Sequence, residues 1–379
     1  MPTSSDPTSS SLNVNLTASP FPTPPTSSIG TVVAGINCDT VDYVQRYSPI
    51  VLTQILQFLL AYTSVSLIIG ARVIQHHAYF HPNVKVLLKT YHGAVLMHGF
   101  ALGTAQIYHI LTSLSYESCE LLISCRLCFG FRVVITSCVI MFSLLLSVVP
   151  IERTIATQNL GRGYENRKST LGTTLSFLTI AVSVSYAVWY HSVDTSNRTC
   201  THCIYDQRDI IPLELMNVLA VLSTVSLAYT LIVLLFNRCE LRKKTYSLGI
   251  EFQINQNIRV LHLVLPISFL TFLAYAWYSG SPYIFDISSQ VDAEIRQFHI
   301  MIQNIFPVYT LLGSGVWLAL MYFEKKKKRA GMMAAELRKD EKDVYFQTLN
   351  DQWSRLPSQK QGRLQILNVF SVPRSSITS

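Results

Sequence analysis

Seven long apolar runs, separated by short polar stretches, dominate the sequence. A helix needs about 20 apolar residues, each rising about 1.5 Å, to cross ~30 Å of hydrocarbon. Because backbone polar groups cannot go without hydrogen bonds in lipid, all seven runs are expected to be helices. The pattern predicts an all-α membrane protein, a seven-transmembrane helix bundle. The predicted spans are Pro49–Ile74, Val84–Leu114, Glu120–Val149, Leu171–Val193, Pro212–Phe236, Val260–Tyr278 and Phe298–Phe323.

Polar segments flank this predicted transmembrane domain of residues 49–323. Residues 1–48 begin with a Ser/Thr/Pro-rich stretch that lacks the basic start and apolar core of a signal peptide, and we expect a disordered tail. Residues 324–379 form a second polar tail, amphipathic near Met332–Phe346 and otherwise unstructured in appearance. Pro266 and Pro307 lie inside the sixth and seventh runs, where kinks are expected.

Composition supports lipid as the solvent for much of the chain. Hydrophobic residues make up 49% of the sequence and charged residues only 14%, against about 25% charged in an ordinary soluble domain. The net charge of +8 comes from short basic clusters between apolar runs. Clusters so placed favour anionic lipid headgroups as partners, so the lipid bilayer is expected and nucleic acid is not.

Basic residues gather in the connections after the odd-numbered runs. Acidic residues prevail on the opposite side, so the positive-inside rule places the N-terminus outside the cell. The basic side includes Arg153, Arg162, Arg167, Lys168, Arg238, Arg242, Lys243, Lys244 and Lys325–Arg329.

Two glycosylation sequons agree with this orientation. Asn15-Leu-Thr17 lies in the N-terminal tail, and Asn197-Arg-Thr199 lies between the fourth and fifth runs. Both asparagines fall on the side already assigned as extracellular. The sequence therefore predicts an extracellular N-terminus and a cytoplasmic C-terminal tail.

Cysteine placement gives the same orientation. Six of the eight cysteines lie at or near the extracellular side, where disulfides persist. Cys128 is 25 residues, or ~37 Å of helix, from Arg153, which places it at the extracellular end of the third helix. Its expected partner is Cys200 or Cys203, in the extracellular loop between the fourth and fifth runs. Cys38 with Cys119 is a second candidate pair. A metal or redox interpretation of Cys200-x-x-Cys203 lacks a second matching pair, and no metal is expected.

A charged pair marks the inner end of the third run. The segment reads Glu152-Arg153-Thr154-Ile155-Ala156-Thr157 and is followed by Tyr164-Glu165. Glu152 can hold Arg153 inward until a motion releases the guanidinium to a partner. In the other interpretation, Arg153 anchors the helix by reaching the headgroups.

This segment resembles the nematode serpentine chemoreceptors of the Sra, Srab and Sre group, which carry a similar Glu-Arg-x-x-Ala-Thr and Tyr-Glu. Further stretches over residues 38–325 are also similar to that group. They are Phe80-His81-Pro82-Asn83, Cys119-Glu-Leu-Leu122 with Cys128 and Arg132, and Tyr246-Ser-Leu-Gly-Ile-Glu-Phe-Gln253 through Asn257.

Some positions depart from the expected pattern. Gln256 replaces an acid before Asn257, and Pro150 precedes Glu152, where the helix is expected to bend. The seventh run reads Asn304-Ile-Phe-Pro307-Val-Tyr309, unlike the Asn-Pro-x-x-Tyr of rhodopsin-type receptors.

The resemblance implies a G-protein-coupled chemosensory receptor that needs no cofactor and has no enzymatic activity. It implies a GPCR-like bundle in the plasma membrane of a sensory cilium, a small-molecule or peptide ligand, and a heterotrimeric G protein as partner. The residues expected to couple to the G protein are Glu152, Arg153, Thr154, Arg242, Lys243, Lys244 and Tyr246.

Ionisable and amide side chains within the membrane are costly, so each is a candidate for ligand binding. A second interpretation pairs Arg132 with an acid such as Glu214 to hold helices together, and uses the aromatics for packing or at the membrane interface. The candidates are His98, Gln106, Arg132, Glu214, Asn217, Tyr275, Trp277 and Asn304.

Other seven-helix proteins fit the sequence less well. A ligand-gated channel of the insect odorant-receptor kind has the opposite orientation. A transporter or membrane hydrolase calls for an internal repeat or clustered mid-membrane histidines and acids. His92, His98 and His109 are six and eleven residues apart, whereas side chains on one helix face recur at three or four.

Overall fold

The computed structural model confirms the predicted seven-helix membrane bundle. It describes residues 32–33, 36–37, 46–75, 80–115, 123–159, 169–192, 199–200, 203, 213–242, 248–285 and 293–354. Seven stretches within these ranges are long and apolar enough to cross a membrane. The first six are α2 (Ser48–Gln75), α3 (Pro82–Ser115), α4 (Cys125–Gln158), α5 (Thr170–Ser192), α6 (Leu213–Arg242) and α7 (Leu248–Phe285).

The seventh span is built from two helices. α8 (Ala293–Gln303) ends where Asn304 and Ile305 leave the helical conformation, and α9 (Phe306–Ser354) begins directly after them. Pro307 is the second residue of α9, where its missing N–H costs no helical hydrogen bond. In contrast, α4 passes through Pro150 and α7 passes through Pro266 without an interruption.

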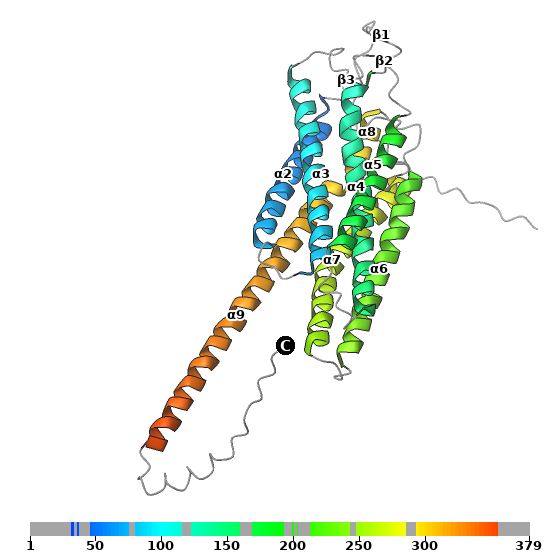
Figure 1. The fold of residues 1–379 in the computed structure, drawn as a ribbon. Helices are drawn as coiled ribbons and strands as arrows, with labels where there is room; N and C mark the ends of the chain where they lie inside the picture. The colour runs from blue at the N-terminus through cyan, green and yellow to red at the C-terminus, as the bar shows by residue number, and fades with distance from the viewer. Residues whose placement is uncertain are drawn as a thin grey trace, which may run out of the picture.

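α4 lies at the centre of the bundle. It contacts α3, α5, α6 and α7, while α2 packs against α3 and α9 (Figure 1). Its most apolar stretch is the most deeply buried of the seven, 72% inside the protein. Large side chains fill the interior around it, among them Phe142, Tyr275, Phe306 and Trp317, all less than 2% exposed. α4 can therefore transmit a shift to most of the other helices.

The two ends of the bundle differ, and we name each by one residue. The Cys203 end carries two short antiparallel ladders, β1 (Val32–Val33) with β2 (Ile36–Asn37) and β3 (Ile123–Ser124) with β4 (Thr199–Cys200). At the other end, the Arg153 end, α4 finishes, and α9 continues far beyond the bundle (Figure 1).

Several element bounds differ from the sequence prediction. The third run was expected from Glu120, but the helix begins at Cys125, after β3. α7 begins twelve residues before the predicted start at Val260, and its first turns are polar. The apolar run therefore marked only the part of the helix suited to the hydrocarbon region. α9 extends the seventh span through the predicted amphipathic segment to Ser354. Residues 355–379 and most of the predicted N-terminal tail lie outside the described residues.

Candidate functional site

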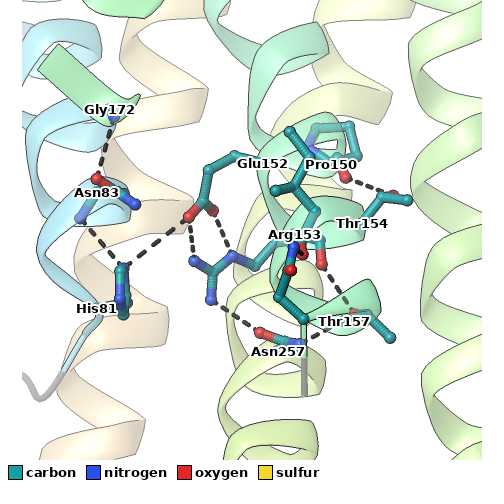
Figure 2. Close-up of polar contacts among 11 residues, drawn as sticks. His81, Asn83, Pro150, Glu152, Arg153, Thr154, Thr157, Gly172 and Asn257 are labelled. Carbon is teal, nitrogen blue, oxygen red and sulfur yellow. Dashed lines mark hydrogen bonds and ion pairs between the residues drawn. The ribbon is translucent and has the colours of Figure 1, made fainter. Parts of the chain in front are cut away.

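Glu152 and Arg153 form a buried ion pair near the end of α4. Arg153 Nε donates to Glu152 Oε2 and Arg153 Nη2 donates to Glu152 Oε1, each at 2.5 Å (Figure 2). Glu152 is 0% exposed and Arg153 2% exposed. Two parallel charge-assisted bonds are the strongest arrangement that these side chains can adopt. Arg153 is thus turned inward and does not reach toward headgroups.

Residues of α6 and α7 hold the other side of Arg153. Arg153 Nη1 donates to Asn257 Oδ1 at 2.8 Å, and Asn257 Nδ2 donates to Thr157 Oγ1 at 3.0 Å. Thr157 Oγ1 lies 2.8 Å from the Arg153 carbonyl oxygen and 3.1 Å from Asn237 Oδ1. These contacts tie α4 to both neighbouring helices.

Glu152 faces α3 and, through it, α5. His81 Nδ1 lies 3.9 Å from Glu152 Oε1, and the Asn83 N–H donates to His81 Nδ1 at 3.3 Å. The Gly172 N–H at the start of α5 donates to Asn83 Oδ1 at 3.1 Å (Figure 2). These contacts therefore reach five helices. We call the connected side chains the Arg153 network: His81, Asn83, Glu152, Arg153, Thr157, Asn237 and Asn257.

The Arg153 network can act as a two-state element. Breaking a buried ion pair by losing one partner costs about 3–5 kcal/mol, because the remaining charge stays uncompensated. Arg153 is therefore stable in only two situations, inside with Glu152 or outside with another acceptor. A shift of α4 relative to α3 or α7 would change which of them is favoured.

Two further predicted coupling residues, Thr154 and Arg242, lie at the same end. Thr154 Oγ1 is 2.7 Å from the Tyr229 hydroxyl of α6 and donates to the Pro150 carbonyl oxygen at 2.9 Å. Arg242 is exposed in the last turn of α6. Lys243, Lys244 and Tyr246 lie outside the described residues.

At the Cys203 end, one residue is held by three contacts from two helices. Cys203 forms a disulfide with Cys128 of α4, with 4.5 Å between the Cα atoms. Arg132 Nε donates to the Cys203 carbonyl oxygen at 2.7 Å, and the Cys203 N–H donates to His109 Nε2 at 2.9 Å. Cys203 is thus one of the two partners expected for Cys128.

The other predicted modifications cannot be placed. Cys38, Cys119, Asn15 and Asn197 lie outside the described residues. Cys200 belongs to β4, and its side chain also lies outside what the structure describes.

The predicted ligand-binding residues divide by burial. His98, Gln106, Arg132 and Tyr275 are buried, and Asn217 and Asn304 are half-buried. Glu214 is exposed in the first turn of α6, and Trp277 is 36% exposed, so neither belongs to the interior group. Burying the Glu214 carboxylate without a cationic partner would cost free energy, which explains its exposure. The Trp277 indole is largely apolar and is stable at the edge of the bundle, in contact with lipid.

The interior candidates have definite neighbours. Gln106 Nε2 donates to Gln57 Oε1 at 2.5 Å, and the His98 ring lies 5.6 Å from the Phe142 ring, centroid to centroid. The Tyr275 hydroxyl donates to the Val139 carbonyl oxygen, and Ser279 donates to Asn217.

These contacts include two residues that were not predicted. Gln57 joins Gln106 to the Met301 carbonyl oxygen, and Asn237 joins α6 to the Arg153 network. Gln57 is an amide inside a long apolar run, and the cost of placing it there was the signal that could have found it. Asn237 lies one residue beyond the fifth predicted run, where the sequence carries no such signal. For the part of the chain that is described, no group of three or more His, Cys, Asp or Glu residues could hold a metal ion.

Similarity to known proteins covers the whole bundle. A family model described as serpentine type 7TM GPCR receptor class ab chemoreceptor matches residues 35–354. The chain is also similar to serpentine receptor class beta-16 of Caenorhabditis elegans. The two are 25% identical over 292 residues, which cover 73% of this chain and 84% of that receptor. The family match contains both the Arg153 network and Cys203.

Proposed function

Because this chain belongs to the serpentine class ab family of seven-transmembrane G-protein-coupled chemoreceptors, we propose that ligand binding frees Arg153 from Glu152 for contact with a heterotrimeric G protein. The protein is a multi-pass membrane chemosensory receptor, and its family is a class of receptors, not of enzymes. The observation that carries the proposal is the buried, bidentate Glu152–Arg153 pair with its contacts to five helices.

The proposal places the Arg153 end in the cytoplasm. Arg238 and Arg242 at the end of α6 and the Lys325–Arg329 cluster of α9 belong to this end, as the positive-inside rule requires. The sequons at Asn15 and Asn197 are then proposed to lie on the opposite, extracellular side, as the sequence predicts. The N-terminus is then extracellular, and the receptor belongs in the plasma membrane, with a sensory cilium as the proposed location.

In this proposal the receptor alternates between two states. In the closed state Arg153 is buried, and in the open state it binds an acceptor on the G protein. A ligand shifts this equilibrium only by its difference in affinity for the two states. The coupling surface comprises Glu152, Arg153, Thr154, Arg242, Lys243, Lys244 and Tyr246.

A small-molecule or peptide ligand is proposed to bind in the half of the bundle nearer Cys203. His98, Gln106 and Asn304 are its proposed contacts, since they place polar atoms among apolar side chains. The Cys128–Cys203 disulfide would fix the loop above this half.

Replacing Glu152 with Gln tests the coupling mechanism. The variant keeps the shape of the side chain but leaves Arg153 without its counter-charge, which favours the open state. A change of about 1.4 kcal/mol is tenfold in an equilibrium, so basal G-protein activation should rise about tenfold or more. The measurement is guanine-nucleotide exchange by a G protein on membranes, normalised to receptor amount.

Glu324→Gln is the matched control. Glu324 Oε2 lies 3.4 Å from Arg259 Nε at the same end, but the Glu324 side chain is 36% exposed and the Arg259 side chain 51% exposed, so the change should alter basal activity little. Arg153→Ala should abolish ligand-driven activation while the protein still reaches the membrane. Equal basal activity in Glu152→Gln and Glu324→Gln would contradict the proposed release of Arg153.

A further inference from the structure

We infer that the interruption of the seventh span, together with His98 and Gln303, binds an uncharged ligand that both donates and accepts hydrogen bonds. The inference rests on the proposed function, because it names the chemistry of the ligand that the receptor detects. We call this place the α8–α9 break site, defined by the non-helical Asn304–Ile305 and the side chains of Gln57, His98, Gln106 and Gln303.

α3 and α2 reach the α8 side of the interruption. Gln106 Nε2 of α3 donates to Gln57 Oε1 of α2, and Gln57 Nε2 donates to the Met301 carbonyl oxygen at 3.0 Å. Carbonyls in the last turn of a helix lack intrahelical partners. Two buried glutamines therefore hold the end of α8.

α3 also reaches the α9 side, through Phe142. The His98 ring lies 5.6 Å from the Phe142 ring, which lies 5.3 Å from the ring of Tyr309 in the first turn of α9. His98 and Gln106 are eight residues apart on α3, or about 12 Å along the helix axis. The two contacts thus bracket the interruption.

Polar atoms at the break site have no hydrogen-bond partner among the described residues. His98 is 0% exposed and Gln303 is 1% exposed, yet both ring nitrogens of His98 and Nε2 of Gln303 are unsatisfied. Gln106 Oε1 is a further atom of this kind. Leaving a buried group unsatisfied costs about 1–3 kcal/mol, so each such group in a folded protein calls for an explanation, and a bound ligand supplies one.

The chemistry of these atoms defines the ligand. The amide nitrogen of Gln303 donates, the amide oxygen of Gln106 accepts, and an imidazole does both. A matching ligand therefore carries at least one donor and one acceptor, as an amide or a hydroxyketone does. Non-helical backbone at membrane depth is tolerated where it faces protein or a polar site, which fits the position of Asn304–Ile305.

The distribution of charge excludes an ionic ligand. Among the described residues, the buried Asp, Glu, Lys and Arg side chains are Arg132, Glu152 and Arg153. Glu152 and Arg153 pair with each other, and Arg132 donates to Cys203. Arg132 precedes Phe142 by ten residues, or about 15 Å of helix. A charged ligand at the break site would bring an uncompensated charge into the interior.

The first test needs no ligand. We expect His98→Phe and Gln303→Leu in the full-length protein, in lipid nanodiscs, to unfold at the same or a higher temperature, because each removes unsatisfied groups. The matched controls His109→Phe and Gln57→Leu remove buried side chains that are hydrogen-bonded, and both should lower Tm by several degrees. His98→Leu checks for an effect of ring size. Equal losses of Tm in both sets would overturn the inference.

The second test uses three probes of one shape in saturation-transfer NMR with the same nanodiscs: benzamide, benzoate and benzylammonium. Benzamide resonances should show saturation transferred from the protein. His98→Phe and Gln303→Leu should abolish this transfer, and Glu214→Gln should retain it. A benzoate or benzylammonium signal with that dependence, or no benzamide signal, would overturn the inference. No G protein is present and only binding is read out, so this result does not depend on the release of Arg153. A failure of the coupling mechanism would therefore be distinguishable from a failure of this inference.

Discussion

Gly172 lets two helices approach closely beside the Arg153 network. A Cβ atom at this position would lie 2.5 Å from the Asn83 carbonyl oxygen and 2.7 Å from the Asn83 Cα atom. The same close approach allows the Gly172 N–H to donate to Asn83 Oδ1. The Asn83 N–H in turn donates to His81, the residue that faces Glu152. The lack of a side chain at Gly172 therefore helps to position His81.

Gly172→Ala should therefore destabilise the receptor. The new methyl group meets backbone atoms, which cannot rotate away, and overpacking of this kind costs about 1–3 kcal/mol. The measurement is thermal unfolding of the purified protein. Gly130→Ala is the control, because no atom lies within 4 Å of its added Cβ and a helical Ala is favoured over Gly. A similar Tm for both variants would contradict the role given to Gly172.

At the scale of elements, three helices meet at a hydroxyl cluster in the middle of the bundle. The hydroxyl oxygens of Tyr91 and Tyr309 lie 2.8 Å apart, and Thr271 Oγ1 donates to the Tyr309 hydroxyl at 3.0 Å. The cluster joins α3, α7 and α9, and the Phe142 ring packs against both tyrosines. It therefore connects the α8–α9 break site with the part of α4 that leads to Glu152.

Tyr309→Phe should weaken this junction without changing its shape. The variant removes two buried hydrogen bonds and leaves the Tyr91 hydroxyl without its partner, a cost of about 1–3 kcal/mol, while Thr271 keeps its bond to the Ile267 carbonyl oxygen. We expect a lower Tm and an altered basal activation of the G protein. Tyr322→Phe, which removes an exposed hydroxyl from the same helix, should change neither quantity. Identical behaviour of the two variants would show that the cluster is dispensable.

The number and order of the spans could be predicted from the sequence, since crossing lipid demands long apolar helices. The interruption of the seventh span depends on contacts that are distant in sequence. Pro266 and Pro307 both lie in apolar runs, yet only at Pro307 does a helix stop just before the proline. There the Met301 carbonyl accepts a bond from Gln57, 244 residues away. The residues around Pro307 in the sequence give no indication of a hydrogen-bond partner so far away in the chain.

The candidate site was predictable where neighbours in sequence are also partners. Glu152 and Arg153 are adjacent, so their pairing could be expected. The contribution of Asn237 could not, because a helix that is apolar on all sides does not show which face is inward. The same ambiguity explains why Glu214 and Trp277, predicted beside His98, lie away from the interior.

At the scale of the whole molecule, the Cys203 end is held together by Cys203. Its disulfide joins residues 75 positions apart, and Arg132 and His109 hold the same residue through its backbone. The loop between α5 and α6 is thereby attached to both α3 and α4. The bundle is thus constrained at the end opposite the Arg153 network.

Removal of the disulfide should destabilise the whole receptor. The Cys128→Ser/Cys203→Ser double variant, or treatment with a reductant, should cost about 2–5 kcal/mol. Thermal unfolding of the full-length protein measures this loss. Cys239→Ser replaces an exposed free thiol and should leave Tm unchanged. Unchanged Tm in the double variant would mean that Arg132 and His109 hold the loop without the disulfide.

The length of α9 means that a small rotation of the helix within the bundle moves its far end by a large distance. Its 31 residues from Glu324 to Ser354 continue the seventh span as one helix, about 46 Å of rigid rod at the rise of an α-helix. A tilt of about 10° at the membrane surface then moves the far end by about 8 Å. Small rotations near Tyr309 would therefore be amplified into displacements large enough for a protein bound to the tip of α9 to detect.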